Sequence, residues 1–95
     1  METLEQAIRA EVSEIPAGMF FDSHVVIKML LQKHCDCYLS QMPKKESVTT
    51  RTYHRQIADM IGEMRDLVED AGESYSFNIH DTPSACRCWK RKQQD

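Results

Sequence analysis

The stretch that decides the fold is SYSFNIHDTPSACRCWKR, residues 74–91. In its first part, Tyr75, Phe77 and Ile79 alternate with small polar residues. This period of two predicts a half-buried β-strand whose apolar side faces the core. Residues 80–84 are rich in turn formers, and residues 86–90 are predicted as the returning strand. The chain therefore ends in a β-hairpin, followed by a flexible tail at about residues 92–95.

Upstream of the hairpin, apolar residues recur every three or four positions, which is the period of an amphipathic helix. Thr3 and Gln6 have the spacing of a capping box, with Thr3 as N-cap of a first helix. Pro, Ala and Gly at 16–18 end this helix, and the apolar residues 19–21 are predicted as a short strand. The apolar stripe of the first helix consists of Leu4, Ile8, Val12 and Ile15.

A second helix starts with Asp22 or Ser23 as its N-cap. It is expected to run to residues 40–42, because Pro43 disfavours helical backbone in the residue before it. A polar loop follows. The apolar stripe of the second helix consists of Ile27, Leu30, Leu31, His34 and Tyr38.

A third helix is predicted to start at Thr49 or Thr50 and to stop at residues 71–72. Gly72 stands where a left-handed helix cap favours glycine. The apolar stripe of this helix consists of Tyr53, Ile57, Met60, Ile61, Met64 and Val68.

Size and composition indicate one globular domain spanning residues 1–95. The chain has 95 residues, of which 41% are hydrophobic and 28% charged, as is usual for such a domain. The net charge of −3 excludes a uniformly basic nucleic-acid coat but allows one basic face. No apolar run reaches the roughly 18–20 residues that cross a bilayer, and no secretory signal is visible. We therefore expect a cytoplasmic protein with no membrane partner.

The order of helix, short strand, two helices and C-terminal hairpin resembles the winged helix-turn-helix superfamily over about residues 3–92. The resemblance implies an α+β, mainly α, domain of three helices with a C-terminal β-hairpin. It implies that the third helix, 50–68, enters the DNA major groove and that the hairpin touches the backbone or minor groove. The segment 43–49 is longer than the three or four residues of a strict helix-turn-helix, which leaves the angle between the flanking helices open.

The third helix carries its basic residues in the first turns and its acidic residues in the last turns. This arrangement opposes the helix dipole, so the charges are expected to face something outside the helix, such as phosphates and base edges. The alternative is that Arg55 pairs with Asp59 one turn later and that the other charges only keep a surface solvated. The candidate DNA-binding residues are Lys44, Lys45, Thr50, Arg51, Thr52, His54, Arg55, Arg87, Lys90 and Arg91.

Two arrangements of the last strand remain open. Arg87, Trp89 and Arg91 share one face, opposite Cys86 and Cys88. If the cysteines pack inward, Trp89 and the arginines face solvent and can contact phosphates. If Trp89 lies in the core, the neighbouring cations belong to a solvated chain end.

The cysteines occur as two C-x-C pairs, at 35 and 37 and at 86 and 88. This spacing argues against a four-cysteine zinc site, because zinc knuckles use wider pairs. A set of His34 and Cys37 with Cys86 and Cys88 would need a long-range meeting that the sequence does not specify. We therefore expect reduced core thiols and no metal. His24, His54 and His80 are interpreted as cap, surface and turn residues.

No sequence motif of a hydrolase, nucleotide-binding loop or metalloprotease occurs, so we expect neither an enzyme nor a bound cofactor. The leading hypothesis is a small DNA-binding module, a transcriptional regulator or accessory factor whose partner is double-stranded DNA. The alternative is a protein-interaction module that uses the winged-helix scaffold without binding DNA, and a homodimer is compatible with both. Its adaptable apolar groove would be formed by Met29, Met42, Met60 and Met64.

Overall fold

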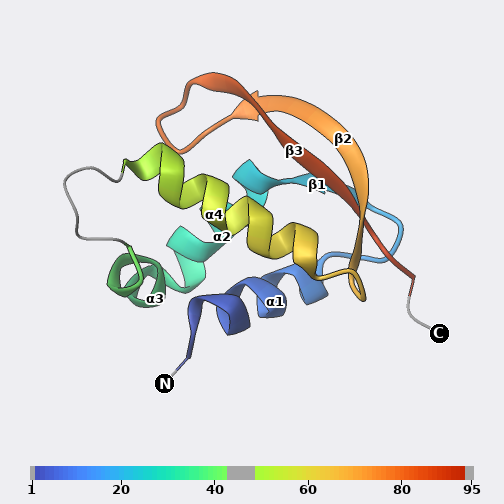
Figure 1. Cartoon of the computed structure of the whole chain (residues 1–95), viewed down its shortest axis with the longest axis horizontal. Coiled ribbons are helices and arrows are strands. Elements are labelled where there is room, and N and C mark those ends of the chain that lie inside the picture. The colour runs from blue at the N-terminus through green and yellow to red at the C-terminus, as the bar shows by residue number, and fades with distance from the viewer. Residues whose placement is uncertain (1, 43–48, 94–95) are drawn as a thin grey trace.

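A computed structural model describes residues 2–42 and 49–93. The described chain is α+β, with its helices packed together on one side of an antiparallel sheet (Figure 1). None of the described helices has the length and apolarity needed to cross a membrane. The elements are α1 (Leu4–Glu14), β1 (Phe20–Asp22), α2 (Ser23–Lys33), α3 (Cys35–Ser40), α4 (Thr50–Glu63), β2 (Val68–Phe77) and β3 (Pro83–Arg91).

The predicted capping box of α1 is confirmed. The Thr3 side chain accepts the backbone N–H of Gln6 at 3.1 Å, and the Gln6 side chain accepts that of Thr3 at 2.9 Å. Two N–H groups that the helix leaves without partners are thereby satisfied. The short strand β1 and the cap of α2 by Asp22, whose carboxylate accepts the N–H of Val25, also match the prediction.

The second helix is shorter than predicted, because the chain breaks at His34 into α2 and α3. His34 has φ −134° and ψ 39°, so it ends one helix and begins the next. Its ring hydrogen-bonds to Glu2 at 2.7 Å through Nδ1 and to Glu11 at 2.9 Å through Nε2. The break turns α3 so that the buried Tyr38 ring packs against the Tyr53 ring, with the two ring centres 5.1 Å apart. The apolar period continues through His34, so periodicity alone could not reveal this break.

We predict that His34 makes stability depend on pH. Burial lowers the pKa of His34, but hydrogen bonds to Glu2 and Glu11 and the charges of these carboxylates raise it more. Because the folded pKa is raised, this stabilisation is complete below the unfolded value of about 6.5 and is lost as pH rises through the folded pKa. The free energy of unfolding from urea titrations should therefore fall as the pH rises above about 6.5.

The matched variants for this pH dependence are His34→Gln and His80→Gln. The first removes the titrating ring beside the buried Glu11. The carboxylate of Glu11 also forms an ion pair with Lys33, whose Nζ lies 3.3 Å from Oε2. His80→Gln removes an exposed ring in the hairpin turn. The fall above about pH 6.5 should vanish in His34→Gln and persist in His80→Gln. If the free energy of unfolding of His34→Gln fell as much as that of the parent chain, His34 would not be the cause of the pH dependence.

The prediction that the third helix reaches residues 71–72 is wrong, because α4 ends at Glu63 and residues 68–77 form β2. Val68 pairs with Arg91 across the sheet and is buried there. Met64 therefore reaches the core from the C-cap of α4, and Val68 reaches it from β2. The helical period of these residues was real, but pairing with β3 determines their backbone.

Gly72 has the left-handed backbone that the sequence predicted, with φ +87°, but it lies in β2 and not at a helix end. The strand register shifts between Asp70 and Glu73, and the Asp70 carboxylate accepts the Gly72 N–H at 2.9 Å. Gly72 is therefore the point at which β2 bulges.

We predict that Gly72→Ala lowers the free energy of unfolding by about 1–2 kcal/mol, because a Cβ is strained at this φ. Space is not the cause, since an added Cβ would meet no atom within 4 Å. Gly72→Asn should cost less, because asparagine tolerates this conformation. Urea denaturation of both variants, with Glu73→Ala as the neighbouring control, measures the difference. Equal stability of Gly72→Ala and the parent chain would show that the positive φ is not required.

The sheet has the order β1-β3-β2, so β3 is the central strand. The prediction that Tyr75 and Phe77 face the core is wrong, since they are 73% and 53% exposed. Ser74 and Ser76 occupy the inner side instead, and Ser74 donates to Asp22 at 3.0 Å. The inner side of this hairpin packs against Asp22 and His24 at the start of α2. These polar side chains hydrogen-bond to the serine hydroxyls, which aromatic rings could not replace.

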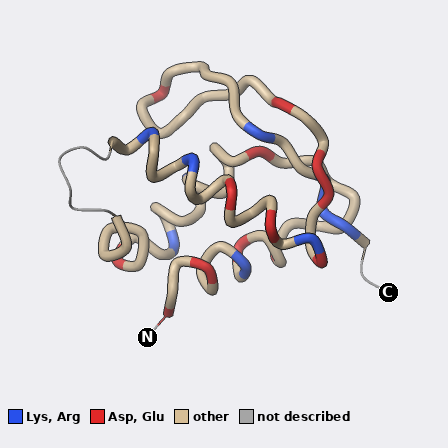
Figure 2. The backbone as a smooth tube through the Cα atoms, in the orientation of Figure 1, with Lys and Arg blue, Asp and Glu red and all other residues tan. Residues whose placement is uncertain are grey.

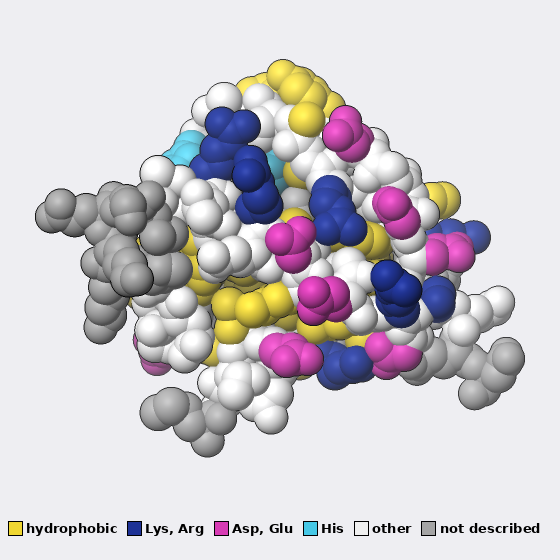
Figure 3. Space-filling view, viewed as in Figure 1, with side chains coloured by type: hydrophobic (Ala, Val, Ile, Leu, Met, Phe, Trp, Pro, Cys, Tyr) yellow, Lys and Arg dark blue, Asp and Glu magenta, His cyan; other side chains and the backbone are white. Residues whose placement is uncertain are grey.

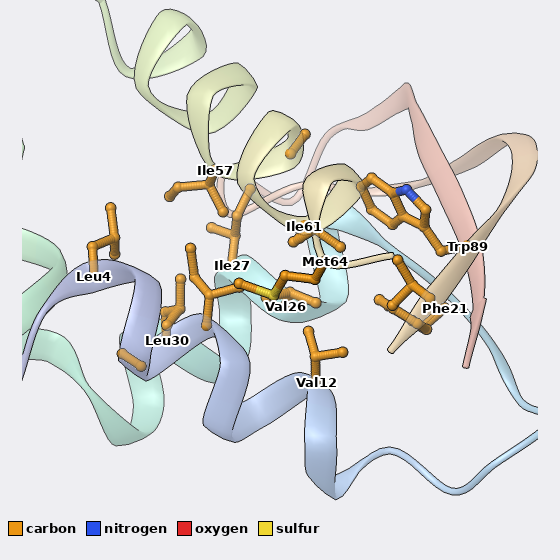
Figure 4. Close-up of a cluster of buried hydrophobic side chains, with 14 of the residues drawn as sticks. Leu4, Val12, Phe21, Val26, Ile27, Leu30, Ile57, Ile61, Met64 and Trp89 are labelled. Carbon is orange, nitrogen blue, oxygen red and sulfur yellow. The ribbon is translucent and has the colours of Figure 1, made fainter. Parts of the chain in front are cut away.

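Trp89 lies in the core, which decides between the two arrangements of the last strand. Its side chain is 1% exposed, the centre of its ring lies 5.8 Å from that of Phe21, and it belongs to the same buried cluster as Ile61 and Met64 (Figure 4). Arg91, on the same face of β3, is also buried. Its guanidinium donates to the carbonyls of Val12, Leu67 and Lys92 and so ties β3 to α1.

Candidate functional site

A groove of about 770 Å³ lies between the start of α2, the first half of α4 and the hairpin. The charged and imidazole side chains of its lining come from segments far apart in the sequence. Figure 3 shows Lys and Arg side chains gathered beside histidine over the start of α4, with acidic side chains farther along the helix. These lining residues are His24, Arg51, His54, Arg55, Asp59, Glu73, His80 and Arg87.

The first half of α4 presents two arginines to this groove. Thr49 caps the helix by accepting the N–H of Thr52 at 3.2 Å, as predicted. Tyr53 and the apolar residues after it are buried, so Arg51 and Arg55 lie on the exposed side. Figure 2 shows these basic positions at the start of α4 and acidic ones toward its end. The basic end of the helix is thus the end that borders the groove.

The pairing of Arg55 with Asp59, which was the alternative to a DNA-facing Arg55, is not formed. Asp59 pairs instead with Arg87 of β3, at 3.3 Å. Among residues 2–42 and 49–93, neither Arg51 nor Arg55 lies within ion-pair distance of an acidic side chain. Both guanidinium groups are therefore available to an anion as far as the described residues go.

Arg87 crosses from the hairpin to α4. Its Cζ lies 5.2 Å from the centre of the Trp89 ring, and its guanidinium occupies the space above Gly62. A Cβ at Gly62 would come within 2.6 Å of an Arg87 nitrogen, so the glycine leaves room for this contact. Asp59 neutralises part of the charge of Arg87, which remains 44% exposed.

Three histidines, at 24, 54 and 80, also line the groove. Burial is the main cause that lowers the pKa of His54, and the nearby His80 and His24 lower it further. His54 Nε2 lies 2.6 Å from the hydroxyl of Tyr38. At neutral pH the His54 ring is therefore uncharged, and it contributes hydrogen-bonding capacity without charge. The interpretation of His24 and His80 as cap and turn residues missed this site, since no spacing in the sequence links them to α4.

Among the described residues, three of the predicted site residues, Thr52, Lys90 and Arg91, are not in the groove lining. Thr52 is exposed on α4, and Lys44 and Lys45 lie outside the described residues. Lys90 lies on the face of β3 opposite Arg87 and Trp89 and farther along the strand than the groove, where its Nζ stands 5.8 Å from the centre of the Phe20 ring. Arg91 is buried and its guanidinium donates to backbone carbonyls, so it is not available to DNA. The predicted residues that do share the groove are Thr50, Arg51, His54, Arg55 and Arg87.

The cysteine pairs lie apart. Cys35 is exposed on α3, and Cys37 donates to the carbonyl of Glu2 near the start of α1. Within the described ranges, neither the four-cysteine set nor the set with His34 comes together. Cys86 instead lies near Asp22 and His24, although no spacing in the sequence connects it to them.

No protein-family model, curated protein or solved structure matches the chain. The groove itself is therefore the feature from which a function can be inferred. Its arginines and hydrogen-bonding side chains suit an anionic ligand that exposes several oxygens at once.

Proposed function

We propose that the protein is a small DNA-binding module, a transcriptional regulator or accessory factor, that holds double-stranded DNA against the groove. The observation that carries the proposal is that Arg51, Arg55 and Arg87 line one groove. Arginine binds phosphate oxygens and guanine edges through two parallel N–H groups of its planar guanidinium. Two of these arginines come from a helix and one from a hairpin, so they can follow adjacent parts of a duplex.

The arrangement of elements supports a winged-helix assignment. A hairpin lies beside the first half of α4 (Figure 1), as a wing does beside a recognition helix. In this proposal the first turns of α4 enter the major groove, and the hairpin contacts the backbone. The extra helix α3 between α2 and α4 departs from the simplest form of this fold.

The acidic residues orient the complex. Asp59 and Glu63 lie in the second half of α4, and Glu69 and Asp70 begin β2. Phosphate repulsion turns this end away from the duplex, so contact is limited to the basic end. Because a chain of net charge −3 has little long-range attraction for DNA, binding depends on these local contacts and weakens steeply with salt.

The proposal is tested by titrating a mixed-sequence duplex into isotope-labelled protein at low salt. Amide signals from residues 50–55 and 84–87 should shift, while those of α1 should stay in place. Raising the salt concentration should reverse the shifts. If no amide of α4 or the hairpin moves at low salt, the proposal is wrong.

A protein-interaction role is the second candidate, and the exposed aromatics of the hairpin favour it. Tyr75 and Phe77 share one face of β2 and are more than half exposed. The predicted methionine groove is not the reason, since Met64 is buried and Met60 packs against the core. A Tyr75→Ser, Phe77→Ser double variant, compared with the parent chain by molecular mass in solution, tests for self-association through this face.

A further inference from the structure

We propose that Asp22, His24 and Cys86 form a Zn²⁺ site that fastens the hairpin to the start of α2. One potential ligand atom from each of the three residues lies within 4.8 Å of the other two. A carboxylate oxygen, an imidazole nitrogen and a thiolate sulfur together are a donor set that zinc accepts. The inference does not rest on DNA binding.

The three ligands come from different segments that the fold brings together. Asp22 ends β1 and caps α2, His24 lies in the first turn of α2, and Cys86 is on the central strand β3. Cys86 pairs with Ser74 across the hairpin, and Ser74 in turn donates to Asp22. The side chains therefore converge because β1 and β2 flank the same strand.

Asp22 is a buried carboxylate that has no basic partner in the described part of the chain. It is 6% exposed, and it accepts hydrogen bonds from the N–H of Val25 and the hydroxyl of Ser74, each at 3.0 Å, with the hydroxyl of Ser76 as a further donor. A buried negative charge is costly unless a cation or several donors compensate it. The donors around Asp22 favour its ionised form, which is the form of a carboxylate that binds a metal ion.

His24 is held in position by two serines. Ser76 Oγ lies 2.9 Å from Nδ1, and Ser84 Oγ lies 3.3 Å from Nε2. On metal binding, one nitrogen keeps its serine partner, which orients the ring, and the other bonds to the ion. Ser76 Oγ also lies 3.9 Å from Cys86 Sγ, so its hydroxyl must rotate aside or remain as a neighbour of the ion.

The distances require only small side-chain movements. Zinc bonds of about 2.0–2.3 Å place neighbouring tetrahedral ligand atoms roughly 3.3–3.8 Å apart. Rotation about side-chain bonds can close a spacing of at most 4.8 Å to this range without moving the strands.

Cys88 lies outside the 4.8 Å grouping, but its place on β3 makes it the candidate for a fourth ligand. It lies two residues from Cys86 and so on the same face of β3, and it stands opposite Asp22 in the β1 pairing. The C-x-C spacing that separates two thiols on a helix brings them to one side of a strand. The complete donor set would then be Asp22, His24, Cys86 and Cys88.

The experiment is a titration of the full chain with Co²⁺ after removal of metals by chelation under reducing conditions. A thiolate-to-cobalt charge-transfer band should grow to one equivalent and disappear when Zn²⁺ displaces the cobalt. Zinc should also raise the melting temperature relative to a sample in EDTA. Absence of the band and of the melting shift in the parent chain would overturn the proposal.

Thiol variants locate the site, because the chain carries a matched pair of cysteines elsewhere. Cys86→Ser and His24→Ala should abolish the zinc-dependent rise in melting temperature, and Cys88→Ser should weaken cobalt binding. Cys35→Ser and Cys37→Ser, on α3, should leave both readouts unchanged. Melting in EDTA shows whether each variant folds. A band that survives Cys86→Ser or is lost in Cys35→Ser would place the metal elsewhere and refute this site.

Discussion

Alanine at Arg51 and Arg55 together should remove measurable duplex binding while leaving the fold intact. Both side chains are exposed at the basic end of α4, so their loss costs little stability. Each should contribute about 1–3 kcal/mol of binding free energy where it contacts a base edge. Where an arginine contacts only phosphate, its loss should weaken binding to all sequences alike and reduce the salt slope by about one. Fluorescence anisotropy of a labelled duplex over a series of salt concentrations measures both quantities.

Arg9→Ala is the matched control for this experiment. Arg9 has comparable exposure but lies on α1, where its guanidinium pairs with Asp66 at 2.8 Å. Its removal should leave duplex affinity unchanged, whereas Arg87→Ala should weaken binding from the hairpin side. Equal losses in Arg9→Ala and the α4 variants would mean that the effect is one of total charge and not of the groove.

Trp89→Ala should be the most destabilising single substitution. The indole is 1% exposed and fills the space between Phe21 and the helical side of the core (Figure 4). Truncation of a buried tryptophan costs about 3–5 kcal/mol, a large part of the stability of a domain of this size. Urea denaturation followed by circular dichroism is the suitable measurement, because the variant lacks the sole tryptophan of the chain.

Trp89→Phe separates the packing of the indole from its polar group. The Nε1–H is buried and has no hydrogen-bond partner among the described residues. Phenylalanine therefore loses volume but no hydrogen bond, and it should destabilise much less than alanine. A loss in Trp89→Phe as large as that in Trp89→Ala would show that the N–H has a partner. Near-parent stability of Trp89→Ala would show that the tryptophan is not part of the core.

Local signals predicted the starts of α1, α2 and α4, but not that of α3. The capping box at Thr3, the Asp22 cap and the Thr49 cap are each formed by residues three apart, so the interaction is visible in the sequence. The helix ends were predicted less well. His34 breaks the second helix through partners that lie 23 and 32 residues away, and β3 draws residues 68–77 into the sheet.

The hairpin shows why strand orientation was harder to predict than strand position. Alternation correctly predicted a strand at Tyr75 and Phe77, but the aromatic side faces solvent. The bulge at Gly72 and the polar start of α2 determine which side turns inward, and neither is part of the alternating pattern. The alternating pattern and the residues that oppose it are both present in the sequence. Only the packing of the hairpin against α2 shows which of them determines the inner side of the strand.

In the candidate site too, local features were predictable from the sequence and long-range contacts were not. By itself, the amino-acid sequence determined that α4 begins with a capped, basic and exposed turn, because caps and helix faces depend on neighbours three or four residues apart. Only the tertiary structure decided that Arg87 joins Arg51 and Arg55, that Arg91 turns inward, and that Cys86 meets His24. Those contacts connect distant segments, and their geometry depends on sheet register and core packing.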